Sequence, residues 1–158
     1  MAEQINHPEL TVTQVNLADK NTVKPVNNSS PASHVIDKPS PKIVLATLNA
    51  RYFHTSFGLR YLYANLKELQ GYCEIQEFII QTRAIDIVEQ ILVSKPDIVG
   101  FGVYIWNIVE TTDVVNLLKV IAPEITIVLG GPEVSYETQQ QAIVDCADYV
   151  LIGPADIS

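Results

Sequence analysis

The residues of this sequence that are best suited to bind a ligand stand directly after apolar runs typical of buried strands. Residues 49–56 are polar and aromatic, residues 104–107 carry two aromatic side chains, and glycines follow the later runs at Gly130, Gly131 and Gly153. The carboxyl ends of parallel strands meet at one edge of a sheet, so we expect these segments to line one crevice. Large aromatic and amide walls over a glycine floor suit a big, flat, partly apolar ligand. Burial of the aromatic side chains in a core or against a partner domain is the open alternative.

The glycine pair allows two interpretations. Gly130 and Gly131 follow the apolar residues 127–129 and precede Pro132 and Glu133. Such a pair is either a tight turn from strand to helix or a bare surface against which a cofactor packs. Taken alone it favours the turn. Because the two aromatic segments are expected at the same edge, we interpret the pair as the floor of a ligand site.

The glycine pattern of a dinucleotide site is absent. A G-x-G-x-x-G fingerprint would follow the first predicted strand, but no glycine stands there before Gly58. Gly100 and Gly102 have G-x-G spacing, yet they lie within a predicted strand and Ile105 occupies the third glycine position. Close packing of the backbone is the interpretation we favour for these two glycines.

The residue types also argue against a magnesium-dependent phospho-acceptor site and against a tight phosphate-binding loop, both of which occur in related folds. A magnesium-dependent phospho-acceptor needs carboxylates after its first and third strands, where this sequence has Asn49 and Tyr104. A tight phosphate loop needs small residues after the first strand, and Arg51, Tyr52 and Phe53 are too bulky for one.

His54 is the single histidine in the part of the sequence predicted to fold, and it stands in the loop after the first strand. Its imidazole could ligate a cofactor metal. The interpretation that we favour is a histidine at the start of a helix, bonded to nearby backbone. His7 and His34 have no cysteine or carboxylate at ligand spacing and are expected to be solvated. No metal site is predicted from residue spacing.

The net charge and the length of the apolar runs restrict the partners that the protein can bind. The net charge of −8 argues against nucleic acid and against an anionic membrane surface, since both require clustered Lys and Arg. No apolar run reaches the roughly 18 residues that a membrane-spanning helix needs. The two cysteines, Cys73 and Cys146, fit reduced thiols of a cytosolic protein better than a disulfide framework. We therefore predict a cytoplasmic protein.

Residues 1–41 are polar and interrupted by prolines, so they are predicted to be a disordered arm. From residue 42 to residue 158 the sequence predicts one domain in which apolar strands alternate with amphipathic helices. The predicted strands are 43–48, 75–80, 97–104, 125–129 and 149–152; the predicted helices begin near 57, 84 and 108, and the last spans residues 135–146. Thr55 or Ser56 can cap the first helix. This order indicates a doubly wound, five-stranded parallel sheet. Because few residues follow Gly153, we expect the last helix to be missing and the domain to be truncated at its carboxyl-terminal edge.

Four segments resemble motifs of a known family: residues 48–56, 95–101, 104–107 and 129–135. Read as LNARYFHTS, KPDIVGF, YIWN and LGGPEVS, they are similar to the amino-terminal cobalamin-binding domain of B12-dependent radical SAM proteins. The resemblance covers residues 42–153. It implies a flavodoxin-like (Rossmann-like) sheet that holds the corrin over its strand ends, with the nucleotide tail running down beside the sheet.

The same resemblance implies a set of cofactor-binding residues. The loop of residues 49–56 would contact the corrin and tail, residues 104–106 would pack at the corrin face, and Gly130 and Gly131 would leave room for the tail. The complete set is Asn49, Arg51, Tyr52, His54, Thr55, Ser56, Gly58, Tyr104, Ile105, Trp106, Gly130, Gly131, Pro132, Glu133 and Gly153.

Two departures from the family pattern matter. Related domains place an axial histidine in D-x-H-x-x-G, whereas here no Asp stands two residues before His54, and Gly58 follows one residue later than in that pattern. The family also continues with Gly-Glu-Gly-Glu and a C-x-x-x-C-x-x-C triad for a 4Fe-4S cluster. This sequence has Gly153 and residues 154–156 instead, and no such triad.

We therefore expect a cobalamin-binding module of a B12-dependent radical SAM, methyltransferase-like protein. No 4Fe-4S or S-adenosylmethionine site is expected in this chain, so it is not expected to be catalytic alone. The expected partners are the corrinoid and a separate or missing radical SAM domain. The alternative is a cofactor-free flavodoxin-like domain that docks on another protein through its exposed aromatic side chains.

Overall fold

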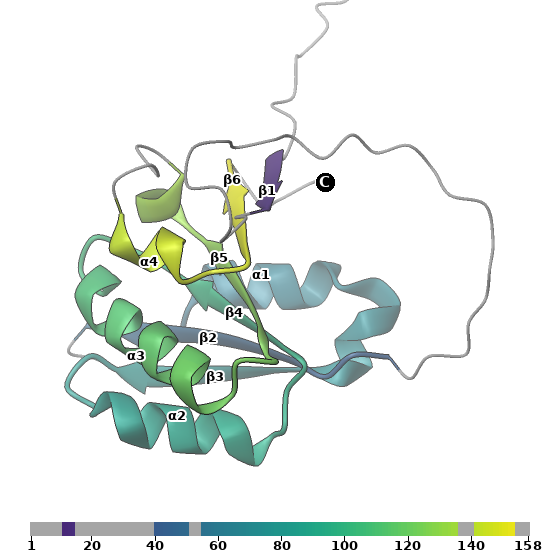
Figure 1. The fold of residues 1–158 in the computed structure, drawn as a ribbon. Coiled ribbons are helices and arrows are strands. Elements are labelled where there is room, and N and C mark those ends of the chain that lie inside the picture. The colour runs from purple at the N-terminus through teal and green to yellow at the C-terminus, as the bar shows by residue number, and fades with distance from the viewer. Residues whose placement is uncertain (1–10, 15–39, 51–54, 136–140, 154–158) are drawn as a thin grey trace, which may run out of the picture.

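A single six-stranded sheet forms the centre of the molecule (Figure 1). The computed structural model describes residues 11–14, 40–50, 55–135 and 141–153. In these residues the strand order is β1-β6-β5-β4-β2-β3, and all neighbours are parallel except β1 and β6. The strands are β1 Thr11–Gln14, β2 Ile43–Asn49, β3 Cys73–Ile79, β4 Ile98–Gly102, β5 Thr126–Gly130 and β6 Tyr149–Ile152.

Helices cover both faces of the sheet, one face more completely than the other (Figure 1). The helices of the first face are α2 Ala84–Val93, α3 Ile108–Ile121 and α4 Ala142–Asp145, and the opposite face carries α1 Phe57–Asn65. Two 3-10 turns complete the described elements, η1 Lys67–Tyr72 and η2 Pro132–Val134. The predicted parallel α/β architecture is confirmed, because β3, β2, β4, β5 and β6 form a parallel sheet joined by helical crossovers.

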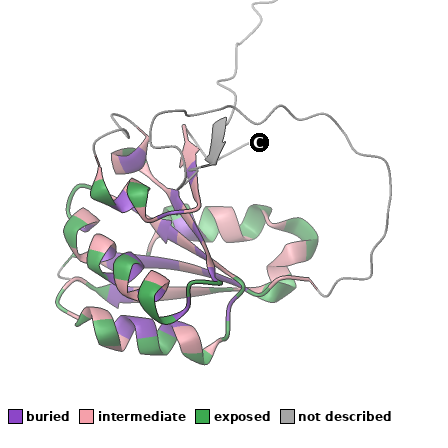
Figure 2. Ribbon diagram, viewed as in Figure 1, coloured by how far each residue is buried: buried purple, intermediate pink, exposed green. Residues whose placement is uncertain are grey.

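The core lies between the sheet and helices α2, α3 and α4 (Figure 2). Strands β4 and β5 each alternate half-buried and buried residues, and the buried ones include Val99, Phe101, Ile127 and Leu129. Alternate residues of a strand point to opposite faces, so these side chains share one face. Full burial there provides most of the hydrophobic stabilisation of the domain.

The opposite face of the sheet is covered less completely. Helix α1 packs on β2 and β3, where Leu59 is buried. On this side of β5 and β6, residues such as Val128 and Leu151 are only half-buried. This partly open face bears directly on the candidate site.

The amino-terminal segment differs from the prediction. Residues 1–41 were expected to be a disordered arm, but Thr11–Gln14 forms β1 and pairs antiparallel with β6. Strand β6 offers unpaired backbone groups on its outer edge, and β1 satisfies them. Most of the remaining arm lies outside the described residues.

The segment after β5 also differs from the prediction. A helix was expected from residue 135 to Cys146, whereas the described part contains η2 before Ser135 and the one-turn α4 after Gln141. Pro132 begins η2 because a proline is tolerated at the first helical position. No described helix is long and apolar enough to cross a membrane.

Candidate functional site

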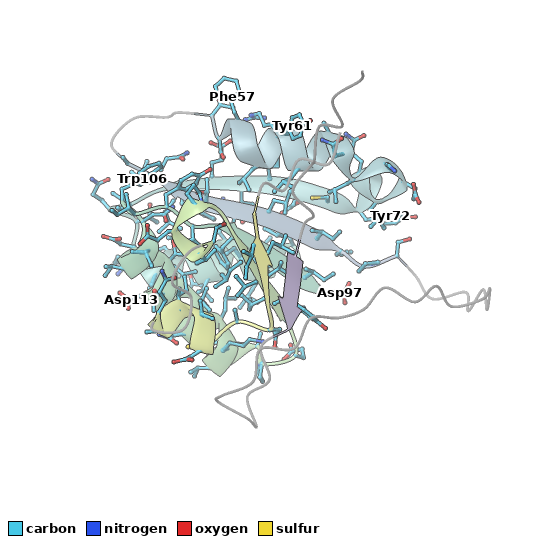
Figure 3. All side chains as sticks on the ribbon, turned by 90° about the horizontal axis from the view of Figure 1, so that it is seen from above. Phe57, Tyr61, Tyr72, Asp97, Trp106 and Asp113 are labelled. Carbon is cyan, nitrogen blue, oxygen red and sulfur yellow. The ribbon has the colours of Figure 1, made fainter. Side chains whose placement is uncertain are left out.

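The carboxyl ends of the parallel strands and the segments that follow them form one edge of the molecule, as the sequence predicted. In Figure 3, Phe57 at the start of α1 and Trp106 after β4 lie toward this edge, whereas Tyr72 and Asp97, which precede strands, lie toward the opposite edge. Close contacts connect these segments to one another. The Tyr104 hydroxyl lies beside Gly58, with 3.3 Å to the position that a Cβ would take.

Asn107 organises the turn after β4. Its side chain is fully buried, and its Nδ2 donates to the backbone oxygens of Leu48 at 3.0 Å and Gly102 at 3.2 Å. Its Oδ1 accepts from the Tyr104 amide at 2.8 Å. The hydroxyl of Thr47 also donates to the Gly102 oxygen at 3.1 Å. One amide side chain thus joins the ends of β2 and β4 to the turn that carries the aromatic residues.

Tyr104 and Trp106 form a stacked aromatic pair. Their ring centroids are 4.5 Å apart and the rings are nearly parallel, at 9°. Trp106 is 50% exposed, and the neighbouring Ile105 is 74% exposed. The turn therefore presents a flat apolar surface to solvent at the carboxyl edge.

Gly131 is required by backbone geometry. Its φ is 118°, and a Cβ at this position would lie 2.3 Å from the oxygen of Val103. The Val103 amide donates to the Gly130 oxygen at 2.7 Å, which holds the two segments together. The interpretation as a tight turn accounts for Gly131 without a ligand.

Gly130 lies in a different environment. A Cβ there would meet only the Leu151 side chain, at 3.8 Å, which is an ordinary contact. Gly130 pairs with Gly102 across the sheet. A Cβ at Gly102 would meet the side chains of Thr47, Tyr104 and Leu59 at 3.6–3.7 Å, so of the two glycines only Gly130 leaves open backbone on the partly open face of the sheet.

The loop after β2 is anchored by a carboxylate from β3. Glu77 accepts from the Asn49 side chain at 2.9 Å and from the Ser56 amide at 3.1 Å. Arg60 of α1 donates to the other carboxylate oxygen at 3.1 Å. Ser56 caps α1 by accepting from the Leu59 amide at 3.4 Å, so the predicted cap is confirmed for this residue.

A cavity of about 300 Å³ lies beside this anchor. It is lined by Asn49, Thr55, Arg60, Ile75, Glu77, Phe78 and Ile79. Polar groups from the loop and from α1 thus face apolar residues of the edge strand β3. Its volume is at the lower limit for small-molecule sites.

The described part of the chain brings together most of the predicted site segments. Pro132 and Glu133 form η2, and Gly153 follows β6 with a φ of 98°. Arg51, Tyr52 and His54 lie outside the described residues, so their predicted roles stay predictions. Among the residues that are described, no group of three His, Cys, Asp or Glu side chains could hold a metal ion.

The thiols are in surroundings that disfavour ionisation. Burial, and secondarily the negative charge of Glu74, raise the pKa of Cys73 to about 11. Burial and the neighbouring Asp145 likewise raise the pKa of Cys146. Both cysteines therefore remain neutral thiols at pH 7, poor as nucleophiles or metal ligands.

Glu74 has a lowered pKa because Ser94 and Gln76 donate hydrogen bonds to it, an effect that outweighs its slight burial. The Arg83 guanidinium lowers the pKa of the exposed Asp86 beside it. Ordinary hydrogen bonding and ion pairing explain both carboxylates, and neither marks an acid or base of a reaction.

Sequence reasoning missed the two residues that organise the site, Asn107 and Glu77. Asn107 was assigned to a loop, and Glu77 to a strand without a role. For Asn107 the signal was present, since an amide directly before a helix commonly bonds local backbone. For Glu77 the weak signal was a carboxylate in an apolar strand, and its partners depend on the folded chain.

Comparison with known proteins identifies a family. The model of a family described as the B12 binding domain matches residues 43–157. One similar solved structure is the 1.5 Å crystal structure of a novel cobalamin-binding protein from Desulfitobacterium hafniense DCB-2, with 24% sequence identity and a TM-score of 0.47. The alignment covers 65% of this chain and 49% of that one, so this chain spans about half of that relative. No curated protein matches the chain.

Proposed function

The chain belongs to the B12-binding domain family, and from this membership we propose that a cobalamin binds at the carboxyl edge of its sheet. The proposed domain spans residues 42–158. When bound, cobalamin supplies methyl-transfer or radical chemistry at its cobalt. The residues of this chain bind the cofactor, orient it and shield part of it from water.

The observation that best supports the proposal is the flat, half-exposed stack of Tyr104 and Trp106. A corrin is large, flat and partly apolar, so it gains contact area from such a surface. Ile105 extends the same surface. Asn107 holds all three residues in place through its buried hydrogen bonds.

The backbone of Gly130 offers room for the nucleotide tail. Gly130 lies on the face of β5 that is only half-buried. A side chain at Gly130 would occupy that space, because its Cβ would approach the Leu151 side chain and nothing else within 4 Å. The tail would replace solvent over apolar residues such as Val128.

The other proposed contacts surround these two surfaces. They come from the loop after β2, from the start of α1, and from the segments after β5 and β6. They are Asn49, Arg51, Tyr52, His54, Thr55, Ser56, Gly58, Gly131, Pro132, Glu133 and Gly153.

We place this domain in a B12-dependent radical SAM, methyltransferase-like system in the cytoplasm. The support is the sequence resemblance of four motifs in order and the two free thiols. The sequence contains two cysteines, fewer than the three that a C-x-x-x-C-x-x-C cluster motif needs. The cluster and S-adenosylmethionine would therefore be bound by a radical SAM domain outside this sequence.

Retention of hydroxocobalamin tests the proposed function. The purified chain is mixed with hydroxocobalamin and passed over a desalting column, and the protein fraction is expected to keep a corrin absorption band. Trp106 is the single tryptophan, so quenching of its emission reports binding at this turn. Protein that emerges without the band would contradict the proposal.

Two aromatic variants locate the site. Trp106→Ala is expected to weaken binding about tenfold or more, since stacking area is lost. Tyr72→Ala is a matched control because Tyr72 is also 50% exposed but precedes β3, at the opposite edge. Equal loss of affinity in both variants would show that hydroxocobalamin binds elsewhere. Binding to Trp106→Ala is followed by corrin absorption, because this variant has no tryptophan emission.

A second candidate function is supported by the exposed apolar residues of the same edge. Phe57 is 86% exposed, and Ile105 and Val109 are also largely exposed. Such residues suit a cofactor-free domain that docks on a protein partner. On that view Trp106→Ala would weaken a protein complex while the chain retained no corrin.

A further inference from the structure

Strand β1 holds the part of β6 that has no register partner on β5. Strand β5 pairs with Tyr149 and Val150, whereas β1 pairs with all four residues of β6. Within the described residues, Leu151 and Ile152 are therefore in register with β1 alone. Figure 1 shows β1 beside β6 at the outer edge of the sheet.

Backbone hydrogen bonds of β5 show which of its residues face β6. The Thr126 amide donates to the Asp97 oxygen, and the Gly130 oxygen accepts from the Val103 amide, so Thr126 and Gly130 face β4. Successive residues of a strand turn their backbone groups to opposite sides of the strand. Leu129, which directly precedes Gly130, therefore faces β6.

The register extends this alternation to β1. Leu129 is the register partner of Val150, and in a parallel pair the residue opposite such a residue turns its own backbone groups away. Val150 therefore faces β1, where its register partner is Thr13. Opposite residues of an antiparallel pair that face each other exchange both hydrogen bonds. The Thr13 amide is thus directed at β6, and the Val12 amide is directed away from it.

Leu151 connects β1 to the site proposed for the nucleotide tail. Val150 is buried in the core, and Ile152 packs against the core. Alternate residues of a strand point to opposite faces, so Leu151 lies on the partly open face of the sheet. A Cβ at Gly130 would lie 3.8 Å from the Leu151 Cβ. The half of β6 that β1 holds therefore adjoins the open backbone of Gly130.

We infer that β1 is a strap that fixes the second half of β6 and thereby shapes the site of the nucleotide tail. The inference rests on the proposed function, because it requires that the tail lies beside Gly130. A preformed site binds with less loss of conformational entropy, so release of β1 weakens binding of the tail. The corrin ring is affected little, because it packs on the turn after β4.

Two single proline variants test the backbone contacts of β1. Thr13→Pro removes the donor that faces Val150. Val12→Pro is the matched control, because it introduces the same residue one position earlier and removes a donor that faces away from β6. Far-UV circular dichroism of each full-length variant checks that the fold is retained.

The first measurement is amide hydrogen exchange at Ile152 by NMR, without ligand. We expect exchange about tenfold faster or more in Thr13→Pro, and within about threefold of the unchanged protein in Val12→Pro. The second measurement compares the affinities for hydroxocobalamin and for cobinamide, a corrinoid without the nucleotide tail. Thr13→Pro is expected to bind hydroxocobalamin about tenfold more weakly, and every other affinity is expected to stay within about threefold.

The results distinguish the two proposals. If the unchanged chain binds neither corrinoid while exchange at Ile152 follows the expected order, the proposed function fails and the hold of β1 on β6 stands. If exchange at Ile152 is the same in both variants, the inference is overturned. It is also overturned if Thr13→Pro weakens binding of both corrinoids equally, since β1 would then not act on the tail, or if it weakens neither.

Discussion

Asn107 illustrates how one buried side chain holds the proposed binding surface. It lies between two strand ends and donates to Leu48 and Gly102, while it accepts from Tyr104. Asparagine offers both a donor and an acceptor on one planar group, which few residues do. The stack of Tyr104 and Trp106 therefore depends on a residue that does not belong to the stack.

Replacing Asn107 tests this dependence. Asn107→Ala is expected to lower the free energy of unfolding by about 2–4 kcal/mol, because backbone groups of the turn lose their buried partners. Asn107→Asp is expected to cost as much or more, since a carboxylate would face the Leu48 and Gly102 oxygens. Urea unfolding at pH 7 measures both.

The matched control is Asn65→Ala, because Asn65 donates to the Tyr61 oxygen at the surface. A change below about 0.5 kcal/mol is expected for it. If the Asn107 and Asn65 variants were equally stable, the buried hydrogen bonds would not contribute as described.

The two adjacent glycines differ in what they tolerate. Gly131→Ala is expected to lower the free energy of unfolding by about 2 kcal/mol or more, because a Cβ would overlap the Val103 oxygen and the φ is positive. Gly130→Ala is expected to cost less than about 1 kcal/mol, since its Cβ makes an ordinary contact. Urea unfolding measures the free energy of unfolding of both variants. A similar decrease in the two would contradict the different roles assigned to Gly130 and Gly131.

At the scale of elements, a charged pair joins α3 to β5 and β6. Lys119 near the end of α3 donates to the Ile125 oxygen at 2.9 Å and to Asp148 at 2.5 Å. Asp148, which directly precedes β6, also accepts from the Ile127 amide at 2.7 Å. The pair therefore sets how the helix and the two strands meet at the amino edge.

Asp148→Ala is expected to lower the free energy of unfolding by about 1–3 kcal/mol, because Lys119 and the Ile127 amide lose a partly buried acceptor. Thermal unfolding followed by circular dichroism measures the change. Asp86→Ala serves as the control, since its pair with Arg83 is exposed and contributes little. A control as destabilised as the Asp148 variant would contradict the assignment.

At the scale of the whole molecule, the sheet is asymmetric. Helices α2, α3 and α4 bury one face, whereas α1 covers only part of the other (Figure 1). The amino-terminal β1 completes the edge at β6. One face therefore provides most of the packing, and the other leaves apolar side chains and the backbone of Gly130 partly uncovered, where we propose that the cofactor binds.

Breaking β1 tests its role at that edge. The double variant Val12→Pro/Thr13→Pro removes two consecutive backbone donors, one of which faces β6. We expect faster amide exchange in β6, notably at Leu151 and Ile152, with little change in the unfolding of the core. Unaltered exchange in β6 would show that β1 does not protect the edge.

The predictions from sequence succeeded where local pattern decides the outcome. Apolar runs marked β2, β5 and β6, and helical spacing marked α2 and α3, because burial on one face imposes a period on the sequence. Prediction was poorer for short elements. Strand β1 has no sustained pattern and exists through its partner β6, and the described residues after β5 form a 3-10 turn and the one-turn α4 where a longer helix was predicted.

The candidate site shows the same division. Residue types after the strands predicted a shared edge with aromatic walls and a glycine floor, and resemblance of motifs indicated cobalamin; the shared edge is confirmed by the parallel strand pairing. Family membership supports that cofactor. The individual contacts and the radical SAM partner remain predictions.

The sequence by itself determined the strand order along the chain, the parallel sheet and the segments that meet at its carboxyl edge, because these follow from local periodicity and general topology. Only the tertiary structure decided what holds those segments. Glu77 is 21 residues from Ser56 and 28 from Asn49, and Asn107 is 59 residues from Leu48. Hydrogen bonds over such separations depend on strand register and side-chain direction, which appear only when the chain is folded.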